Sequence, residues 1–221
     1  MRFMVLLLAW GLGNAQPAQA GAWLQPEGSA FASLETTIRE RNGDTQIETD
    51  IFFEYGLSPR LSGGLTLLQE GGRTGHLALF LKTPLGRTDK PYATSLQADL
   101  GGYFKGREWF GMSKLTLSYG RGFRWGDGYG WLNIDTAIEY RMGESAPFFK
   151  LDGTIGRSSG ARIRPMFELS ITHIEDQPLI WSVSPNLLFD SSDKLTWLLG
   201  LERKEAGKTS HAVTFGLWRR F

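Results

Sequence analysis

The chain has 221 residues and carries 24 Lys and Arg against 23 Asp and Glu, so its formal net charge is close to zero. A neutral chain gives no general electrostatic case for binding nucleic acid. The sequence contains no cysteine, which excludes disulfides, thiolate metal sites and a cysteine nucleophile. Its mean hydropathy is negative, and after the first residues no apolar run is long enough for a membrane-spanning helix.

The first twenty residues have the pattern of a secretory signal peptide. Arg2 gives a short positive region, residues 3–12 form an apolar stretch, and residues 18–20 (Ala-Gln-Ala) form a small-residue cleavage site. The apolar stretch is shorter than the roughly 20 residues that span a bilayer. We therefore predict that residues 1–20 are removed on export by the general secretory route. Residues 21–221 are then a single domain.

Long runs with a period of two dominate residues 21–221. From Thr45 to Leu57 one parity is apolar or Thr throughout, while the other is mostly Gln, Glu and Asp. Strands of soluble sheets usually have about five or six residues, whereas a tilted membrane-spanning strand needs about 9 to 11. The pattern predicts an all-β fold, an up-and-down antiparallel transmembrane barrel. Closure removes the open edges that lipid cannot satisfy.

The alternating runs recur along the whole chain. In chain order, the apolar parities expected to face lipid include Leu34, Ile51, Leu65, Leu79, Ala98, Leu117, Ile134, Leu151, Phe167, Val183, Leu199 and Phe215. This order gives twelve strands, or ten if the weak runs around Leu61 and Leu115 merge into loops. Pro165 and Pro185 fall inside two of these strands. Because proline donates no hydrogen bond, we predict bulges on neighbouring strands there, or a misplaced strand boundary.

The connections between runs are rich in Gly, Pro, Asn and Asp and are predicted to be short. With the amino terminus in the periplasm, the odd-numbered connections are extracellular. Two longer links are expected from Tyr103 to Gly111 and from Arg121 to Tyr129, both rich in Trp, Phe and Gly. We expect them to anchor the barrel in the headgroup region, where aromatic residues form girdles. The tryptophans assigned to this girdle are Trp23, Trp109, Trp125, Trp131 and Trp218.

Four stretches carry a resemblance to a known family: the start Gly-Ala-Trp at 21–23, residues 53–61 (FEYGLSPRL), residues 79–86 (LFLKTPLG) and the terminal strand. The chain resembles proteobacterial outer-membrane barrel proteins that have no assigned substrate and are loosely described as transporters. The resemblance implies a Gram-negative outer membrane, contact with its lipid and lipopolysaccharide, and delivery by periplasmic chaperones to the barrel-assembly machinery.

The end of the chain matches the signal by which that machinery recognises its substrates. The matching residues are Thr214, Gly216, Leu217 and Phe221. Arg219 departs from the family pattern, because an aromatic or apolar residue is usual at its position. An arginine near the periplasmic interface can snorkel towards water, so its cost at that depth is small.

The inward parity is where a solute would meet the protein. The charged residues predicted to line the pore are Glu35, Glu48, Asp50, Glu54, Asp99, Lys114, Asp135, Glu139, Lys150, Asp152, Arg164 and Glu168. Acids concentrate on the first two strands, and bases on the sixth, eighth and ninth. This pattern favours a passive channel for small polar or zwitterionic solutes. We expect its selectivity to depend on Glu48, Asp50 and Glu54, facing Lys114, Lys150 and Arg164.

Two other classes of protein stay open. In a non-conducting structural barrel, opposing rows of charges would pair as salt bridges and fill the lumen. A lipid-modifying enzyme would place a histidine and a hydroxyl on the lipid side, and His173 and His211 face outward near extracellular strand ends. The only outward hydroxyl two residues from either histidine is that of Thr209, beside His211. A threonine is a poor nucleophile without its own activating amine. We therefore predict no catalytic residue and no cofactor. We also predict no metal site, because His76, His173 and His211 lie on three different strands.

Overall fold

The computed structural model describes residues 21–41, 43–86, 91–158 and 161–221. The predicted signal peptide, residues 1–20, lies outside the described residues. Among the described residues, no helix is long and apolar enough to cross a membrane. The strands are β1 (Ala30–Arg41), β2 (Asp44–Ser58), β3 (Leu61–Glu70), β4 (Thr74–Pro84), β5 (Tyr92–Lys105), β6 (Glu108–Trp125), β7 (Gly128–Arg141), β8 (Phe148–Arg157), β9 (Ile163–Ile174), β10 (Ile180–Ser192), β11 (Leu195–Glu205) and β12 (Thr209–Arg220).

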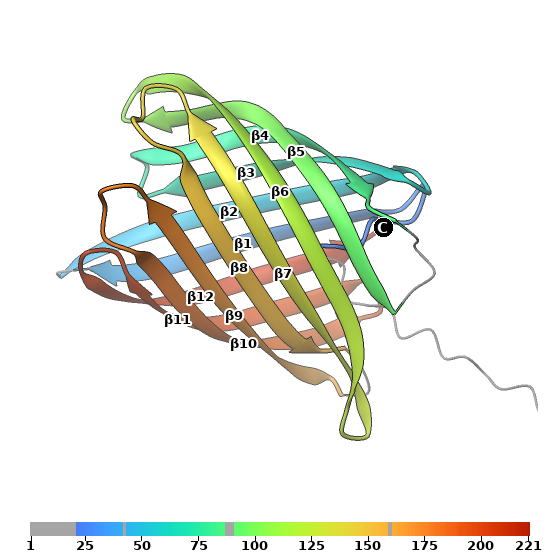
Figure 1. Cartoon of the computed structure of the whole chain (residues 1–221). Helices are drawn as coiled ribbons and strands as arrows, with labels where there is room; N and C mark the ends of the chain where they lie inside the picture. The colour runs from blue at the N-terminus through green and yellow to red at the C-terminus, as the bar shows by residue number, and fades with distance from the viewer. Residues whose placement is uncertain (1–20, 42, 87–90, 159–160) are drawn as a thin grey trace, which may run out of the picture.

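The strands pair antiparallel in chain order, and β12 pairs with β1 to close the barrel (Figure 1). The predicted fold and the count of twelve strands are confirmed, and the alternative of ten strands is wrong. The weak run around Leu61 is a complete strand, β3, and Leu115 lies in β6, the longest of the barrel with 18 residues. Alternation identified both because its period survives even where the apolar residues are few.

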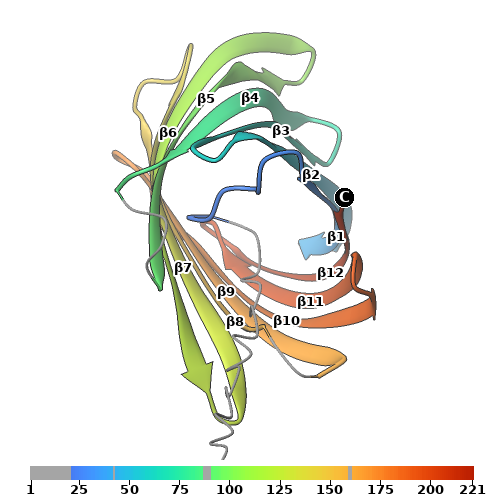
Figure 2. The same cartoon turned by 90° about the vertical axis from the view of Figure 1, so that its right-hand side faces the viewer.

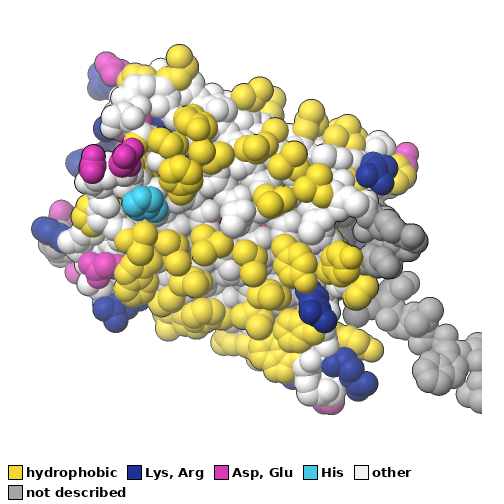
Figure 3. All heavy atoms as spheres, viewed as in Figure 1, with side chains coloured by type: hydrophobic (Ala, Val, Ile, Leu, Met, Phe, Trp, Pro, Cys, Tyr) yellow, Lys and Arg dark blue, Asp and Glu magenta, His cyan; other side chains and the backbone are white. Residues whose placement is uncertain are grey.

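The outer wall carries the apolar parity of each strand. Leu79 and Leu100, which pair across β4 and β5, are 66% and 69% exposed. Figure 3 shows hydrophobic side chains covering the wall, with charged side chains gathered at its two ends. Such large exposed side chains are stable only against an apolar solvent, so this wall is built to face lipid.

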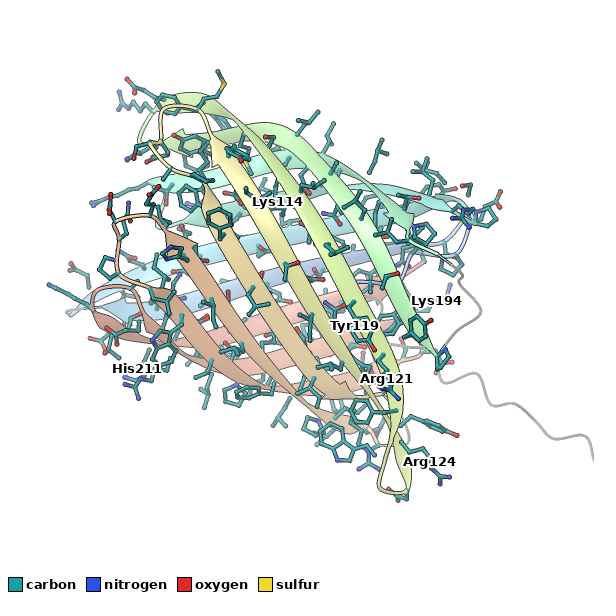
Figure 4. The ribbon with its side chains drawn as sticks, in the orientation of Figure 1. Lys114, Tyr119, Arg121, Arg124, Lys194 and His211 are labelled. Atoms are coloured by element: carbon teal, nitrogen blue, oxygen red, sulfur yellow. The ribbon has the colours of Figure 1, made fainter. Side chains whose placement is uncertain are left out.

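The two links predicted at Tyr103–Gly111 and Arg121–Tyr129 are wrong as loops. Their residues belong to β5, β6 and β7, which are joined by two-residue connections at 106–107 and 126–127. The β6–β7 hairpin extends past its neighbours, because the pairing of β5 with β6 ends at Tyr92 opposite Arg121. Figure 4 shows Arg121 and Arg124 on this extension. A stretch rich in aromatic residues and Gly can therefore belong to a strand as well as to a loop, so composition alone did not distinguish the two.

Pro165 and Pro185 lie inside β9 and β10, on the lipid side of adjacent strands. The register between these two strands is unbroken, so the predicted bulges and the misplaced boundary are both wrong there. Proline instead interrupts pairing on the far side of each strand. Pairing of β8 with β9 stops at Met166, and pairing of β10 with β11 skips from Val183 to Asn186. The missing N–H groups explain both gaps.

The ends of the barrel differ. The amino-terminal segment, residues 21–29, and the last residue lie at one end, here called the terminal end; the opposite end is called the far end (Figure 1). The backbone N–H of Phe221 donates to the carbonyl of Ala30 over 2.9 Å, which fixes the chain end to the start of β1. By the orientation expected from the sequence, the terminal end faces the periplasm.

Three tryptophans assigned to the membrane girdle lie inside the barrel instead. Trp131 and Trp218 are 2% and 8% exposed and belong to a hydrophobic cluster, and Trp23 packs against it. The buried members of this inner cluster are Phe31, Trp131, Met166, Leu188, Leu198 and Trp218. Trp109 and Trp125 are exposed. The girdle assignment failed for Trp131 and Trp218 because it used residue type and ignored strand parity, whereas Trp23 precedes β1 and has no strand parity.

Candidate functional site in the barrel lumen

All twelve residues predicted to line the pore lie on strand faces opposite to the apolar wall. On β1 and β2, for example, Glu35 pairs directly with Asp50. On β7 and β8, Asp135 pairs directly with Asp152. The twelve residues come from β1, β2 and β5 to β9, and their partners decide what each can do.

Seven ion pairs run along the inner wall. They are Arg39–Glu48 at 2.6 Å, Arg39–Glu202 at 2.8 Å, Lys82–Glu54 at 2.7 Å, Lys114–Asp99 at 3.4 Å, Arg141–Glu139 at 2.6 Å, Lys150–Glu139 at 2.6 Å and Arg164–Asp190 at 2.7 Å. Each joins residues on one strand or on strands at most two positions apart around the barrel. Among the described residues one pair reaches further, Lys204–Glu70 at 3.9 Å, which joins β11 to β3 at the far end.

The partners of the charged residues differ from the arrangement expected from the sequence. Glu48 and Glu54 bind Arg39 and Lys82, whereas Lys114, Lys150 and Arg164 bind other acids. Within the described chain, no contact joins the three predicted acids to the three predicted bases. The charges pair with neighbours on the wall, so the predicted opposition across the lumen is not a set of salt bridges.

Arg39 is a central residue of the lumen that was not singled out from the sequence. Its guanidinium donates through Nε and Nη2 to both carboxylate oxygens of Glu48, at 2.6 and 2.8 Å, and through Nη1 to Glu202. The side chain is 4% exposed. The planar guanidinium favours such bidentate contacts. Arg39 shares its strand parity with Glu35, which was the available signal for its inward position.

Five carboxylates in the middle of their strands have no basic partner among the described residues. We call them the acidic ring: Glu35, Asp50, Asp135, Asp152 and Glu168. Three of them accept hydrogen bonds from neutral groups. Trp218 Nε1 donates to Glu35 over 2.9 Å, Ser170 Oγ to Asp152 over 2.5 Å and Asn186 Nδ2 to Glu168 over 2.8 Å.

The members of the acidic ring influence one another electrostatically. Asp50 interacts with Glu35, and Glu35 with Glu168. Glu168 interacts in turn with Asp152, and Asp152 with Asp135. The five carboxylates thus form one electrostatically linked group, which extends from β2 and β1 to β9, β8 and β7. Like charges at such spacing are tolerated only when water or counterions share the space.

Two bases act on the acidic ring without forming an ion pair with it, Lys150 on Asp152 and Lys114 on two of its members. Lys114, labelled in Figure 4, pairs with Asp99 and acts electrostatically on Asp50 and Asp152. Asp50 is itself exposed, on an inward strand face, so its carboxylate reaches the open part of the lumen. The inner surface around the ring is therefore predominantly acidic, with Lys114 and Lys150 at its border, each paired with an acid outside the ring.

The remaining candidates have other surroundings. His173 stacks on Phe149, with ring centroids 6.5 Å apart, and His211 is exposed at the far end of β12 (Figure 4). Arg162 precedes β9, and its guanidinium carbon lies 6.0 Å from the ring centroid of Phe189, a lipid-facing residue. Within the described chain, no three His, Asp or Glu side chains converge in an arrangement that could hold a metal ion.

Known proteins resemble this chain in structure. The KdgM porin superposes with a TM-score of 0.64 at 6% identity, covering 86% of this chain and 99% of that one. The NanC porin gives 0.59 at 8% identity, covering 84% and 98%. The chain therefore shares with these two porins the fold of a closed antiparallel β-barrel. The β domain of the Bordetella autotransporter BrkA gives 0.52 at 13% identity, covering 87% and 98%. No protein-family model and no curated protein matches the sequence.

Proposed function

We propose that the protein is a passive, porin-like channel of the Gram-negative outer membrane for small polar solutes. We further propose that it passes cations and zwitterions in preference to anions. The acidic ring carries this proposal, because five inward-facing carboxylates near the middle of their strands form no ion pair with a base among the described residues. The porin fold of the KdgM and NanC neighbours supports a transport role without naming a solute.

The physical argument concerns the cost of unpaired charge. An ionised carboxylate removed from water without a partner is strongly unfavourable. The acidic ring therefore favours a hydrated lumen at its level. Charge of one sign that lines a narrow aqueous passage attracts counterions and lowers their barrier to entry. Asp50, which is exposed, is the member best placed to meet a solute.

The same argument separates this chain from one of its structural neighbours. One structure of the KdgM porin is a complex with disordered oligogalacturonate, which is a polyanion. The acidic ring would repel such a chain. We therefore propose for this protein a substrate class of the opposite or mixed charge.

The ion pairs bear on the alternative of a non-conducting structural barrel. Salt bridges that fill a lumen must cross it, whereas seven of the eight inner pairs described above run along the wall. They stabilise the strands locally and do not link opposite sides of the barrel. The enzyme alternative has less support, since His173 contacts an aromatic ring and not a hydroxyl.

We also propose the route by which the barrel reaches its membrane. Residues 1–20 would direct export, and Thr214, Gly216, Leu217 and Phe221 would present β12 to the barrel-assembly machinery. Phe221 is 56% exposed, and its ring contacts the guanidinium of Arg219, which lies 4.9 Å from the ring centroid. Replacing Phe221 with Ala should lower the amount of folded barrel in outer-membrane fractions, whereas Phe189→Ala on the lipid-facing wall should not. Equal amounts of both variants would contradict this role.

The channel is tested by recording single-channel currents from the refolded protein in planar bilayers. Discrete current steps with a cation preference are expected. Heat-modifiable migration in electrophoresis provides the check that the barrel is folded. A folded barrel that gives no current but releases fatty acid from phospholipid would replace the channel with the enzyme. A folded barrel that does neither would favour the structural role.

A further inference from the structure

The amino-terminal segment, residues 21–29, lies inside the barrel. Figure 2, a view onto the terminal end, shows this segment in blue within the ring of strands. Ala22 and Gln25 are 1% and 2% exposed, so the wall and the segment cover each other closely. No periodicity in the sequence marks this segment.

Lys82 binds the backbone of the segment. The ammonium group donates to the carbonyls of Gly21 and Trp23 at 3.2 and 3.0 Å and to Glu54 Oε2 at 2.7 Å. An ammonium has three donors, so all of them are used. Lys82 and Glu54 are 1% and 0% exposed. The lysine therefore links the wall to the segment through a fully enclosed contact.

A second contact ties the segment to the other side of its groove. The backbone N–H of Ala22 donates to Asn133 Oδ1 over 2.9 Å. Asn133 lies on β7, three strands away from Lys82 on β4. Further along, Gly28 and Ser29 exchange backbone hydrogen bonds with Gly56 at 3.0 Å each. The segment is thus strapped across strands β4 to β7 and is anchored to β2.

The wall is shaped to admit the segment. A methyl group added at Gly120 would lie 2.5 Å from the ring of Trp23, so only glycine allows this approach. On its opposite side, Trp23 packs against the inner hydrophobic cluster that contains Phe31 and Trp131. One tryptophan therefore bridges the polar wall and the apolar cluster.

The wall beneath the segment is polar. Glu54, Ser62 and Ser95 of the strands are buried and have side-chain atoms with no hydrogen-bond partner among the described residues, as has Gln25 of the segment itself. Ser62 pairs with Lys82 in the ladder of β3 and β4, so these groups surround the anchor. A surface of this kind accepts water readily, and it would become a hydrated passage if the segment moved away.

We propose that residues 21–29 form the constriction of the pore at its terminal end and that Lys82 is the positioning residue that keeps them there. This inference rests on the channel function proposed above. The acidic ring then selects solutes by charge, whereas the segment limits their size. Loss of the Lys82 anchor should widen the passage without altering the ring.

The test uses the absence of cysteine from the chain. Gln25→Cys introduces a single thiol, and it removes no hydrogen bond because the amide of Gln25 has no partner in the described structure. The folded variant is treated with a charged, water-soluble maleimide, and the labelling rate is measured. The thiol should react slowly when the segment is docked. Adding Lys82→Met and Glu54→Gln together should raise the rate about tenfold or more, as expected when a local opening becomes frequent.

Two further variants complete the design. Lys204→Met in the Gln25→Cys background removes a lysine of the far end and should leave the labelling rate unchanged. Asn133→Ala keeps the lysine and removes only the acceptor of the Ala22 amide, so it should give a smaller acceleration. It also keeps the test decisive if the charge variant does not fold. Unchanged labelling in the folded anchor variants would overturn the role of Lys82.

Conductance separates this inference from the channel proposal. If the segment is the constriction, the anchor variants should show larger single-channel steps than the parent at the same cation preference. Faster labelling with unchanged conductance would overturn the constriction. Silence from all folded variants would overturn the channel and the constriction together. In that case the labelling rates would still decide whether Lys82 anchors the segment.

Discussion

Glu54 and Asp50 lie four residues apart on the same face of β2, yet their surroundings are opposite. Glu54 is fully buried and bound to Lys82, whereas Asp50 is exposed and has no basic partner in the described chain. The same chemical group therefore serves two purposes. A paired acid at the terminal end fixes structure, and an unpaired acid in the ring remains available to a solute. The partner, more than the residue type, decides the role of an inward charge.

The largest expected effect on stability comes from removing the lysine of the Lys82–Glu54 ion pair. Lys82→Met leaves the carboxylate of Glu54 buried without its partner, which should lower the free energy of unfolding by about 3–5 kcal/mol. The measurement is a urea titration of the refolded barrel followed by heat-modifiable migration.

The matched double variant sharpens this first prediction. Lys82→Met with Glu54→Gln removes both charges, and buried pairs replaced as a unit usually cost far less than a single broken pair. Most of the lost stability should return. If the single and double variants lose the same stability, the carboxylate of Glu54 in Lys82→Met does not carry the cost of a buried, unpaired charge.

Arg39 gives the next effect in size. Arg39→Gln removes three charge-assisted hydrogen bonds and leaves Glu48 and Glu202 close together, so stability should fall by about 2–3 kcal/mol. Arg73→Gln, in an exposed turn, is the control and should change the urea midpoint little. The role of Arg39 would be refuted if both variants shared one midpoint.

Trp218 should give the smallest effect. Trp218→Phe keeps an aromatic ring in the inner cluster but removes the Nε1 donor to Glu35, which should cost about 1–2 kcal/mol. Trp197→Phe on the lipid-facing wall serves as the comparison, since Trp197 is 50% exposed. A cost as large for Trp197 as for Trp218 would argue against a contribution from the hydrogen bond to Glu35.

Much of the fold was predictable because alternation is a local property of the sequence. The parity of Leu132 and Ile134 already placed Trp131 inside, and Trp218 shares its parity with Thr214 and Gly216. The girdle assignment set this signal aside. Arg39 could have been found in the same way. The sequence predicted that Pro165 and Pro185 lie inside strands. It did not predict with which neighbouring strand each proline interrupts pairing.

The contacts of the lumen depend on which strands become neighbours and on how far long side chains reach. Parity placed Glu48 and Lys150 inside, but it could not show that each binds an adjacent strand. The docking of residues 21–29 was also beyond the sequence, because those residues have no period and their contacts come from four distant strands. The acidic ring could not be predicted for the same reason, because which carboxylates lack an ion pair depends on the neighbouring strands.

The most direct test compares ring acids with acids outside the lumen. The reversal potential of the open channel is measured under a KCl gradient for Glu35→Gln/Asp50→Asn/Glu168→Gln and for a control of equal charge change in exposed turns, Glu175→Gln/Asp176→Asn/Asp193→Asn. The acidic ring predicts that the preference for potassium over chloride falls sharply in the first variant and stays near the parent value in the control. A ring variant that is folded, conducts and keeps the parent's cation preference would contradict the account.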